Sequence, residues 1–309
     1  MSAAEFQLTT TDGLALFVRA WLPETRSAKA VVQIAHGMAE HSARYEWLAE
    51  QLNNAGYAVV MNDHRGHGET AVAQKLPHGY FSDAKGWEKV VDDLALVNAY
   101  IRSEHPGLPV FLLGHSMGSH ISQSYLIRYG NTIDAAMLSG TNGAAGPFQY
   151  VGRLVAFIER LRVGATGASA VLDATSYDAF NKPFKPARTR FDWLSRDTAQ
   201  VDKYVADPWC GFSCSPSMWS DLLKGVGFNE RDKNLAAIPK TLPVYLITGS
   251  EDTSNNAETG VRALEKRYLK AGIAQVDVRI YEDGRHEMFN ETNREEVAAE
   301  TIAWFDSCL

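Results

Sequence analysis

The sequence predicts an α/β fold in which a mainly parallel sheet is covered by helices on both faces. Short apolar runs alternate with amphipathic helical runs in the first and last thirds of the chain, as expected for repeated strand, helix, strand units. Hydrophobic residues at 45% and charged residues at 22% are ordinary for a globular protein. There is no apolar stretch of about 18 residues, and no basic start followed by an apolar run. We therefore expect a cytoplasmic protein that does not span a membrane.

Charge and cysteine content narrow the possible partners. The formal net charge is -7, from 30 Lys and Arg against 37 Asp and Glu, so no overall basic field favours nucleic acid. The three cysteines cannot all pair within one chain, which favours a reducing compartment. Cys210 and Cys214 could form a local disulfide or half of a metal site, but no nearby His or Cys completes such a site. We favour free structural thiols, and expect neither a metal nor a cofactor.

The elements of the first 140 residues follow from turn residues and apolar spacing. Asp12-Gly13 separates two β-type runs and predicts a hairpin, and Gly56 ends a helical run. Helical spacing of apolar residues predicts the long helix that starts near Gly86. The predicted strands are 6–10, 14–21, 30–35, 57–61, 109–113 and 135–138, and the predicted helices are 45–55, 86–103 and 117–128.

The alternation stops between 141 and 231, where short helical patterns are broken by Gly, Pro and Ser and no convincing buried strand occurs. It resumes with strands at 242–248 and 275–281 and helices at 258–270 and 294–305. We therefore expect a core made of residues 1–140 and 232–309, and an inserted helical cap made of residues 141–231.

A candidate nucleophile follows the predicted strand 109–113. Gly114-His-Ser116-Met-Gly118 places a serine between a strand and a helix, with glycine two positions before and after it. On such a tight turn the serine hydroxyl is exposed, larger flanking side chains would collide, and the helix N-terminus favours negative charge. A Gly-flanked serine is often only a turn, but the flanking strand and helix favour Ser116 as nucleophile.

A serine hydroxyl needs a base and a third group that fixes the base's tautomer. Beyond His120, which is one turn into the helix after the serine, His286 is the only later histidine. An isolated loop histidine would be solvated by default, but here the order serine, acid, histidine favours His286 as general base. For the acid we favour Asp252, just after the strand 242–248. Its competitors are Glu251, expected to face solvent, and Asp283, expected to shape the histidine loop.

Backbone amides must stabilise the negative charge that develops on the substrate carbonyl. We assign this role to the amides of Met117, the residue after the nucleophile, and Met38, in the loop after the strand 30–35. Gly37 lets the backbone approach the substrate. Alternatively, His36-Gly37 only ends the strand.

Three segments together resemble the lysophospholipase and monoacylglycerol lipase group of α/β-hydrolases, filed in part with the serine aminopeptidases S33. These segments are His36-Gly-Met-Ala-Glu-His-Ser-Ala-Arg-Tyr45, Asp63-His-Arg-Gly-His-Gly68 and Gly114-His-Ser-Met-Gly118. The resemblance implies an α/β-hydrolase fold with an eight-stranded sheet, a helical cap after the sixth strand, no cofactor, and cleavage of a fatty acyl ester. Matched by motif, Ser116, Asp252 and His286 take the catalytic positions, and Met38 and Met117 the oxyanion positions. The loop 63–68 matches one with a structural role.

The cap segment 148–190 is locally basic, with seven Lys and Arg against three acids in a chain of net charge -7. An apolar stripe at helical spacing is formed by Val151, Leu154, Val155, Ile158 and Leu161. One hypothesis is a lid that contacts lipid surfaces. We favour the alternative, in which the stripe packs onto the core and the cations are solvated.

The leading functional prediction is a serine hydrolase that cleaves a carboxylic ester of a lysophospholipid, a monoacylglycerol or a general small-molecule ester through an acyl-enzyme. Two alternatives stay open. The same three residues could serve a peptidase or amidase, although the cap sequence identifies no acidic group for a substrate amine. The fold could also serve a non-catalytic ligand-binding protein, although such a protein is expected to lose a member of the triad.

Overall fold

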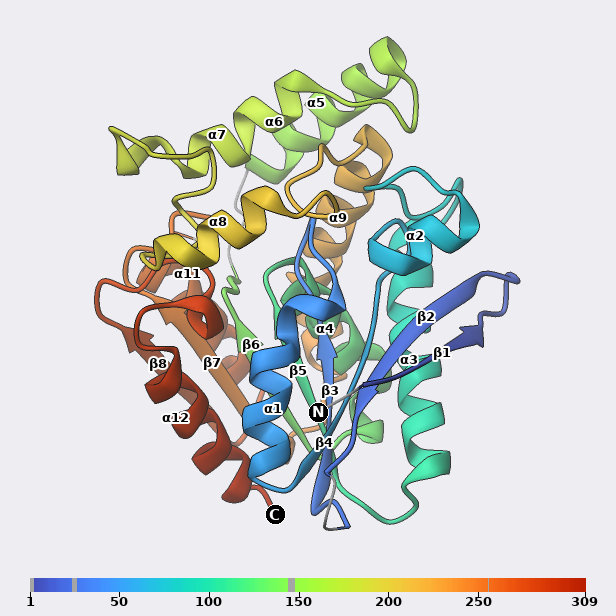
Figure 1. Ribbon diagram of the computed structural model, residues 1–309, viewed down its shortest axis with the longest axis vertical. Coiled ribbons are helices and arrows are strands. Elements are labelled where there is room, and N and C mark those ends of the chain that lie inside the picture. The colour runs from blue at the N-terminus through green and yellow to red at the C-terminus, as the bar shows by residue number, and fades with distance from the viewer. Residues whose placement is uncertain (1–2, 24–26, 144–147, 255) are drawn as a thin grey trace.

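The structure is a computed structural model that describes residues 3–23, 27–143, 148–254 and 256–309. Its centre is one eight-stranded sheet with the strand order β1-β2-β4-β3-β5-β6-β7-β8 (Figure 1). The pairs β1-β2 and β2-β4 are antiparallel, and all later pairs are parallel. The strands are β1 Ala4–Thr9, β2 Ala15–Trp21, β3 Ala30–Ala35, β4 Tyr57–Asn62, β5 Val110–His115, β6 Ala135–Ser139, β7 Val244–Gly249 and β8 Val276–Tyr281. The predicted mainly parallel eight-stranded α/β-hydrolase sheet is confirmed.

The register of the parallel strands brings their carboxyl ends to one edge. Ala35 of β3 is paired with Gly114 of β5, and His115 is paired with Ser139 of β6. Gly249 of β7 is paired with Tyr281 of β8. Consequently the loops that carry four of the predicted site segments, those after β3, β5, β7 and β8, leave the sheet side by side.

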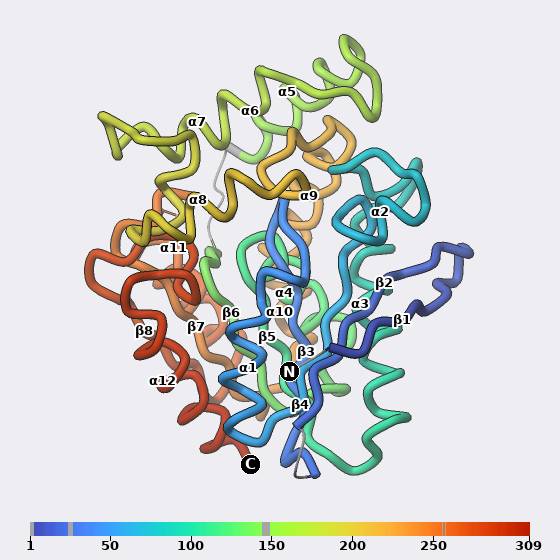
Figure 2. Tube along the Cα trace, viewed as in Figure 1, coloured from blue at the N-terminus to red at the C-terminus, as the bar shows by residue number. Residues whose placement is uncertain are grey.

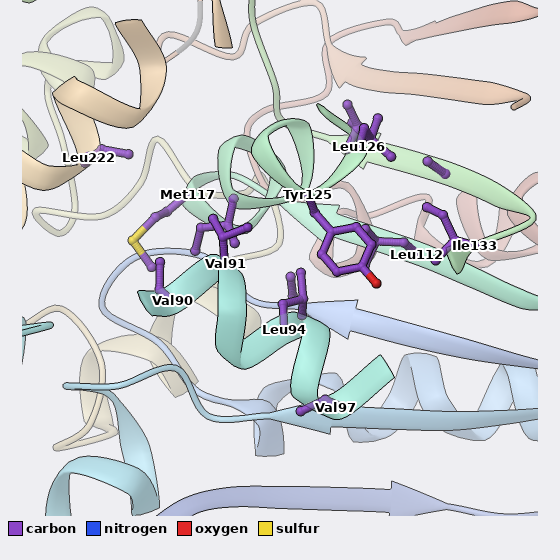
Figure 3. Close-up of a cluster of buried hydrophobic side chains, with 14 of the residues drawn as sticks. Val90, Val91, Leu94, Val97, Leu112, Met117, Tyr125, Leu126, Ile133 and Leu222 are labelled. Carbon is purple, nitrogen blue, oxygen red and sulfur yellow. The ribbon is translucent and has the colours of Figure 1, made fainter. Parts of the chain in front are cut away.

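Helices cover both faces of the sheet. On one face α3 (Gly86–Glu104), α4 (Met117–Tyr129) and α11 (Ala257–Lys270) bury their apolar sides in one cluster. Figure 3 shows Val90 and Leu94 of α3 lying against Met117 and Tyr125 of α4. On the other face α1 (Glu46–Asn54) and α12 (Arg294–Asp306) pack on a second cluster. These five predicted helices are confirmed.

One core helix, α2 (Gly68–Gln74), was not predicted. It has seven residues, and it begins at the end of the glycine-containing loop 63–68, so it lacks a long periodic pattern. The carboxylate of Asp63 accepts hydrogen bonds from the amides of Ser42 at 2.7 Å and Glu69 at 2.8 Å. These bonds join the start of α2 to the loop after β3.

Most of the described helices between β6 and β7 lie above the carboxyl edge of the sheet (Figure 1), and the last ones reach down beside the strands (Figure 2). Figure 2 follows the chain from β6 through these helices and back into β7. They are α5 Phe148–Val163, α6 Ala170–Thr175, α7 Tyr177–Phe180, α8 Thr198–Ala206, α9 Pro216–Asn229 and the short α10 Asp232–Leu235. Residues 144–147 of the predicted cap, and residues 1–2 of the N-terminus considered for targeting, lie outside the described residues.

The apolar stripe of α5 faces outward, and the prediction that it packs onto the core is wrong. Val151, Leu154, Ile158 and Leu161 are 59%, 59%, 51% and 74% exposed, and only Val155 of the stripe is half-buried. The reason is that the inner face of α5 uses small residues. Ala156 is fully buried, and a Cβ on Gly152 would lie 3.1 Å from Leu223 of α9. The small residues let the two helices approach closely and leave the large side chains outside.

Two further predictions concern the membrane and the thiols. Among the described helices, none combines the length and apolarity needed to cross a bilayer. The three cysteines are unpaired, as predicted, with Cys214 buried and Cys210 and Cys308 partly exposed.

Candidate active site

Ser116 lies on a strained turn between β5 and α4. Its backbone has φ 52° and ψ -119°, a region that side chains other than glycine rarely occupy. Only glycine fits at the two flanking positions, because a larger side chain would collide with its neighbours. A Cβ on Gly114 would lie 2.3 Å from Ser122 Oγ, and one on Gly118 would lie 2.1 Å from the carbonyl oxygen of Ala35. The turn therefore presents Ser116 at the carboxyl edge of the sheet, as the motif predicts.

The structure brings Asp252 and His286 together. His286 Nδ1 donates to Asp252 Oδ2 at 2.7 Å, and both side chains are almost completely buried. This bond places the ring proton on Nδ1 and leaves Nε2 as the basic nitrogen. His286 and Ser116 line the same pocket. The geometry therefore fits the predicted pairing of Asp252 with His286, at the pocket that contains Ser116.

The two side chains shift each other's titration. Burial by itself lowers the pKa of His286, but the charge and hydrogen bond of Asp252 outweigh it and raise the pKa above the ordinary value. Burial alone raises the pKa of Asp252, and His286 together with hydrogen bonds from Ser254 brings it below the ordinary value. The pair is therefore arranged to stabilise a charged imidazolium beside a carboxylate.

Ser254 is a site residue that was not predicted from the sequence. Its hydroxyl donates to Asp252 Oδ1 at 2.7 Å, and its oxygen lies 2.9 Å from His286 Nδ1. Its backbone amide also donates to Asp252 Oδ1 at 3.0 Å. The spacing Asp-x-Ser after a strand is typical of a side chain that accepts hydrogen bonds from the turn it begins, and this pattern could have indicated Ser254.

The competing acids lie elsewhere. Glu251 is exposed, and the side chain of Asp283 is 67% exposed on the turn before His286. The amide of Asp283 donates to Ser250 Oγ at 2.8 Å, which ties that turn to the end of β7. Neither carboxylate contacts His286 among the interactions of the described residues, whereas Asp252 does.

The two predicted oxyanion residues come from the segments that follow β3 and β5. Met117 is the first residue of α4, and Met38 follows β3 by three residues. Both line the pocket that contains Ser116. Gly37 lies close to the serine, since a Cβ on it would be 3.3 Å from Ser116 Cβ. The amide of Gly37 donates to Glu40 Oε1 at 2.5 Å, which fixes the turn that carries Met38.

A network of buried ion pairs, which the sequence did not predict, holds this loop in place. Arg44 donates to Glu40 at 2.5 Å and to both oxygens of Glu287 at 2.7 Å. Tyr45 also donates to Glu40, at 2.9 Å. Since Glu287 is the neighbour of His286, the network connects the loop of Met38 with the loop of His286.

The pocket is a cavity of about 190 Å³ whose far wall comes from the segment between β6 and β7. That wall is largely apolar. The apolar side chains that line the cavity are Met38, Met117, Tyr177, Phe180, Trp193, Leu194, Tyr204, Trp219, Leu222, Leu223 and Val226. A site with a few polar groups at one end and an apolar wall suits a ligand with an apolar chain.

The segment that contains Trp193 and Leu194 is hydrogen-bonded to the loop that carries His286. The amide of Glu287 donates to the carbonyl of Leu194 at 2.8 Å, and that of His286 to the carbonyl of Trp193 at 3.4 Å. The Trp193 ring lies 4.9 Å from the His286 ring, measured between centroids. The histidine is therefore positioned by this segment as well as by the sheet.

Comparisons with known proteins agree with this geometry. The family model "Serine aminopeptidase, S33" matches residues 26–293. A monoacylglycerol lipase of Mycolicibacterium smegmatis is 28% identical over 99% of this chain and 98% of its own length. The human monoglyceride lipase is 30% identical over 92% of this chain and 84% of its own.

Solved structures show the same fold. A thermostable carboxyl esterase of Bacillus coagulans superposes with a TM-score of 0.90 and 24% identity, covering 100% of this chain and 99% of that one. A lipase in an open form superposes with a TM-score of 0.86 and 27% identity, covering 99% of each chain. With the family model spanning most of its length, the chain belongs to the serine aminopeptidase S33 family of α/β-hydrolases.

Proposed function

We propose that this chain hydrolyses carboxylic esters of the lipid type, such as monoacylglycerols or lysophospholipids, through an acyl-enzyme on Ser116. The observation that carries the proposal is the convergence at one apolar cavity of Ser116 and of a histidine held by Asp252. The similarity to lipases and esterases supports the substrate class.

In the proposed reaction, His286 Nε2 accepts the Ser116 hydroxyl proton while the serine oxygen attacks the ester carbonyl. The resulting oxyanion is stabilised by the amides of Met38 and Met117, at about 3 kcal/mol for each donor. The imidazolium then gives its proton to the departing alcohol. Water, activated by the same histidine, releases the acid and regenerates the serine. Asp252 keeps the ring in the required tautomer throughout.

The cavity chemistry favours an ester over a peptide with a free amine. Two carboxylates line the cavity, Glu40 and Glu287, and both are ion-paired with Arg44. An aminopeptidase needs a carboxylate directed at the substrate amine, and both of these carboxylates are instead bound to Arg44. The apolar wall instead suits an acyl chain or an uncharged alcohol.

The test is turnover of soluble and lipid esters by the wild-type chain and by Ser116→Ala. We expect hydrolysis of p-nitrophenyl butyrate and monooleoylglycerol, and a loss of at least about 10⁴-fold in kcat for the variant with unchanged thermal unfolding. Ser119→Ala, three residues further along α4, is the matched control. Turnover retained in Ser116→Ala would contradict the proposal, and selective cleavage of amino acid p-nitroanilides would assign a peptidase instead.

We also propose that residues 141–231 form a cap over the core of 1–140 and 232–309, and that α5 makes peripheral contact with lipid surfaces. Large apolar side chains on α5 are more than half exposed, including Phe157 and Leu161. Arg153, Lys224 and Arg231 line a hollow of about 310 Å³ between α5 and α9. An apolar face flanked by cations suits a helix lying in a bilayer interface with anionic headgroups.

Co-sedimentation with vesicles tests the lipid contact separately from catalysis. We expect stronger binding to phosphatidylcholine vesicles with one fifth phosphatidylglycerol than to phosphatidylcholine alone, and weaker binding for Leu154→Ser with Leu161→Ser. Leu269→Ser, on the exposed face of α11, should leave binding unchanged. Absence of binding to both vesicles would contradict the lipid contact and leave the ester hydrolysis proposal intact.

The location proposed for the chain is the cytoplasm. Support comes from the three unpaired thiols, which persist most readily in a reducing compartment.

A further inference from the structure

We propose that His41, Asp207 and Cys210 form a binding site for a zinc-type divalent cation at the junction between the loop of Met38 and the helices above the sheet. The donor atoms of these three side chains all lie within 4.8 Å of one another. The sequence analysis considered Cys210 and Cys214 together as half of a metal site, whereas the donors that the structure places beside Cys210 are His41 and Asp207. The fold supplies His41 from 169 positions earlier in the chain, since 210 minus 41 is 169.

The donors come from two rigid pieces of backbone. Asp207 and Cys210 are the first and last residues of a turn closed by the bond from the Cys210 amide to the Asp207 carbonyl at 3.1 Å. The amide of Trp209 donates to Asp207 Oδ1 at 2.8 Å, which orients the carboxylate. Such a turn directs the side chains three positions apart to one side, as paired ligands with two intervening residues do in zinc sites.

His41 approaches this turn from the loop after β3. Its Nε2 lies 2.8 Å from Asp207 Oδ2, and its side chain is only 8% exposed. The two pieces are tied together without a metal, because the Gly211 amide donates to the Ala39 carbonyl at 3.0 Å and the Tyr204 hydroxyl donates to the same oxygen at 2.9 Å. The three donors are therefore preorganised, and binding requires little ordering of the chain.

The donor chemistry is that of a borderline cation. A thiolate, an imidazole and a carboxylate form the mixed ligand set that zinc and cobalt accept in tetrahedral sites, and that calcium and magnesium disfavour. A hollow of about 290 Å³ lined by His41 and Asp207 leaves room for a water as the fourth ligand. With three protein ligands and an open position, the site resembles the open type of zinc site in coordination number.

The charges around the site suit a dication. Once bound, the thiolate and the carboxylate balance the two positive charges of the metal. Three cations, Arg44, Lys203 and Arg294, line the hollow beside the site. Arg294 is ion-paired with Glu295, and Arg44 is ion-paired with both Glu40 and Glu287, so the group of Arg44 and its two partners carries one net negative charge.

Metal binding replaces protons and one hydrogen bond of the three side chains by bonds to the metal. The metal displaces one proton from Cys210 Sγ, and it replaces the Nε2 proton of His41 as the ring takes up its proton on Nδ1 instead. One proton is released to solvent for each ion bound. The hydrogen bond between His41 and Asp207 is replaced by one bond from each residue to the metal. The metal then links the loop of Met38 to the turn 207–210.

The experiment is titration of the full-length chain, first freed of metal with EDTA, with cobalt and zinc. We expect about one cobalt ion per chain, with near-ultraviolet thiolate-to-cobalt charge-transfer absorption, displacement of cobalt by zinc, and a higher Tm in zinc. Cys210→Ser should remove the charge-transfer absorption. Asp207→Asn and His41→Gln should each weaken zinc binding more than about a hundredfold.

Cys308→Ser and Cys214→Ser are the matched controls, since they remove the other two thiols and should leave the titration unchanged. Persistence of the charge-transfer absorption in Cys210→Ser, or its loss in Cys308→Ser, would overturn the assignment. Absence of any cobalt spectrum in the wild-type chain would overturn it as well, and would leave Asp207 and His41 as a structural hydrogen-bonded pair. None of these readouts depends on ester hydrolysis.

Discussion

Both oxygens of the Glu287 carboxylate accept hydrogen bonds at 2.7 Å from the two terminal nitrogens of Arg44. The pair is almost fully buried, and Arg44 also binds Glu40. Bidentate geometry fixes the guanidinium plane, so the loop before α1 and the loop that carries His286 hold one relative position.

Replacing Arg44 tests how much this network stabilises the fold. Arg44→Met keeps an unbranched apolar stem but removes the guanidinium, which leaves two buried carboxylates without a cation. We expect a loss of about 3 to 5 kcal/mol in the free energy of unfolding, measured by urea denaturation at pH 7.5. The double variant Arg44→Met with Glu40→Gln should recover part of the lost free energy of unfolding, because it removes one of the two unpaired buried charges. An unchanged urea midpoint in Arg44→Met would show that the network contributes no stability.

Asp252→Asn tests the bond between Asp252 and His286. An amide favours the wrong tautomer of the ring, so kcat should fall by about 10⁴-fold. In the wild-type chain the acid limb of the kcat/KM profile should have its midpoint above 6.5, the ordinary value, because the pKa of His286 is raised. The limb should move to lower pH in Asp252→Asn, since the charge of Asp252 is a cause of that raised pKa. Glu251→Gln is the matched control, and an equal effect of both substitutions would contradict the assignment of Asp252.

Ser254→Ala separates positioning from chemistry. The variant removes one hydrogen bond to Asp252 Oδ1 and leaves the bond between Asp252 and His286 in place. A hydrogen bond to a charged group contributes about 1.5 to 3 kcal/mol, so kcat/KM should fall by roughly 10- to 150-fold while Ser250→Ala stays near wild type. A fall as large as that of Asp252→Asn would mean that Ser254 has more than a positioning role.

Buried neutral histidines predict acid lability. Burial is the main cause that lowers the pKa of His64 and His115 to about 3 and of His67 and His120 to about 4, from an ordinary 6.5. Below pH 6.5 the unfolded chain therefore binds protons that the folded chain does not, and stability falls as the pH falls. Each histidine contributes up to about 1.4 kcal/mol per pH unit between 6.5 and its folded pKa.

Urea midpoints at pH 7.5 and 5.5 measure this dependence. We expect a clear loss of stability at pH 5.5 and a smaller loss in His67→Phe, whose ring lies among Phe81 and Phe212. His105→Phe, at the end of α3, should keep the wild-type difference. Equal midpoints at the two pH values would contradict the prediction.

The sequence predicted the sheet, most core helices and the segments that meet at its carboxyl edge, because each rests on local patterns. Strand runs such as 30–35 and 109–113 are continuous apolar stretches, and the Gly-flanked Ser116 needs only its own turn. The position of Asp252 followed from the strand that precedes it. Hydrogen bonds between residues far apart in the sequence leave no local pattern. The bonds of Arg44 to Glu287 and of His41 to Asp207 were therefore not predicted.

The orientation of α5 shows a different reason for failure. Its apolar stripe predicted a buried face, because periodicity identifies a stripe but not what covers it. Which face is buried depends on the neighbour, and here the small residues Gly152 and Ala156 match the surface of α9. Ser254 was missed for a simpler reason, since a serine in a turn is common and its partners lie in two loops.

The hydrogen bonds that the His286 and Glu287 amides donate to the carbonyls of Trp193 and Leu194 limit the exchange of segments between relatives. A chimaera cut at 148 and 190 would exchange Tyr177 and Phe180 of the cavity wall and keep the hydrogen bonds of Trp193 and Leu194 beside His286. A chimaera cut at 148 and 215 would replace those residues together with Asp207 and Cys210. Starting from residue 148, the part of the cavity wall that can be exchanged without touching the histidine loop therefore ends just before residue 191, within the segment between β6 and β7.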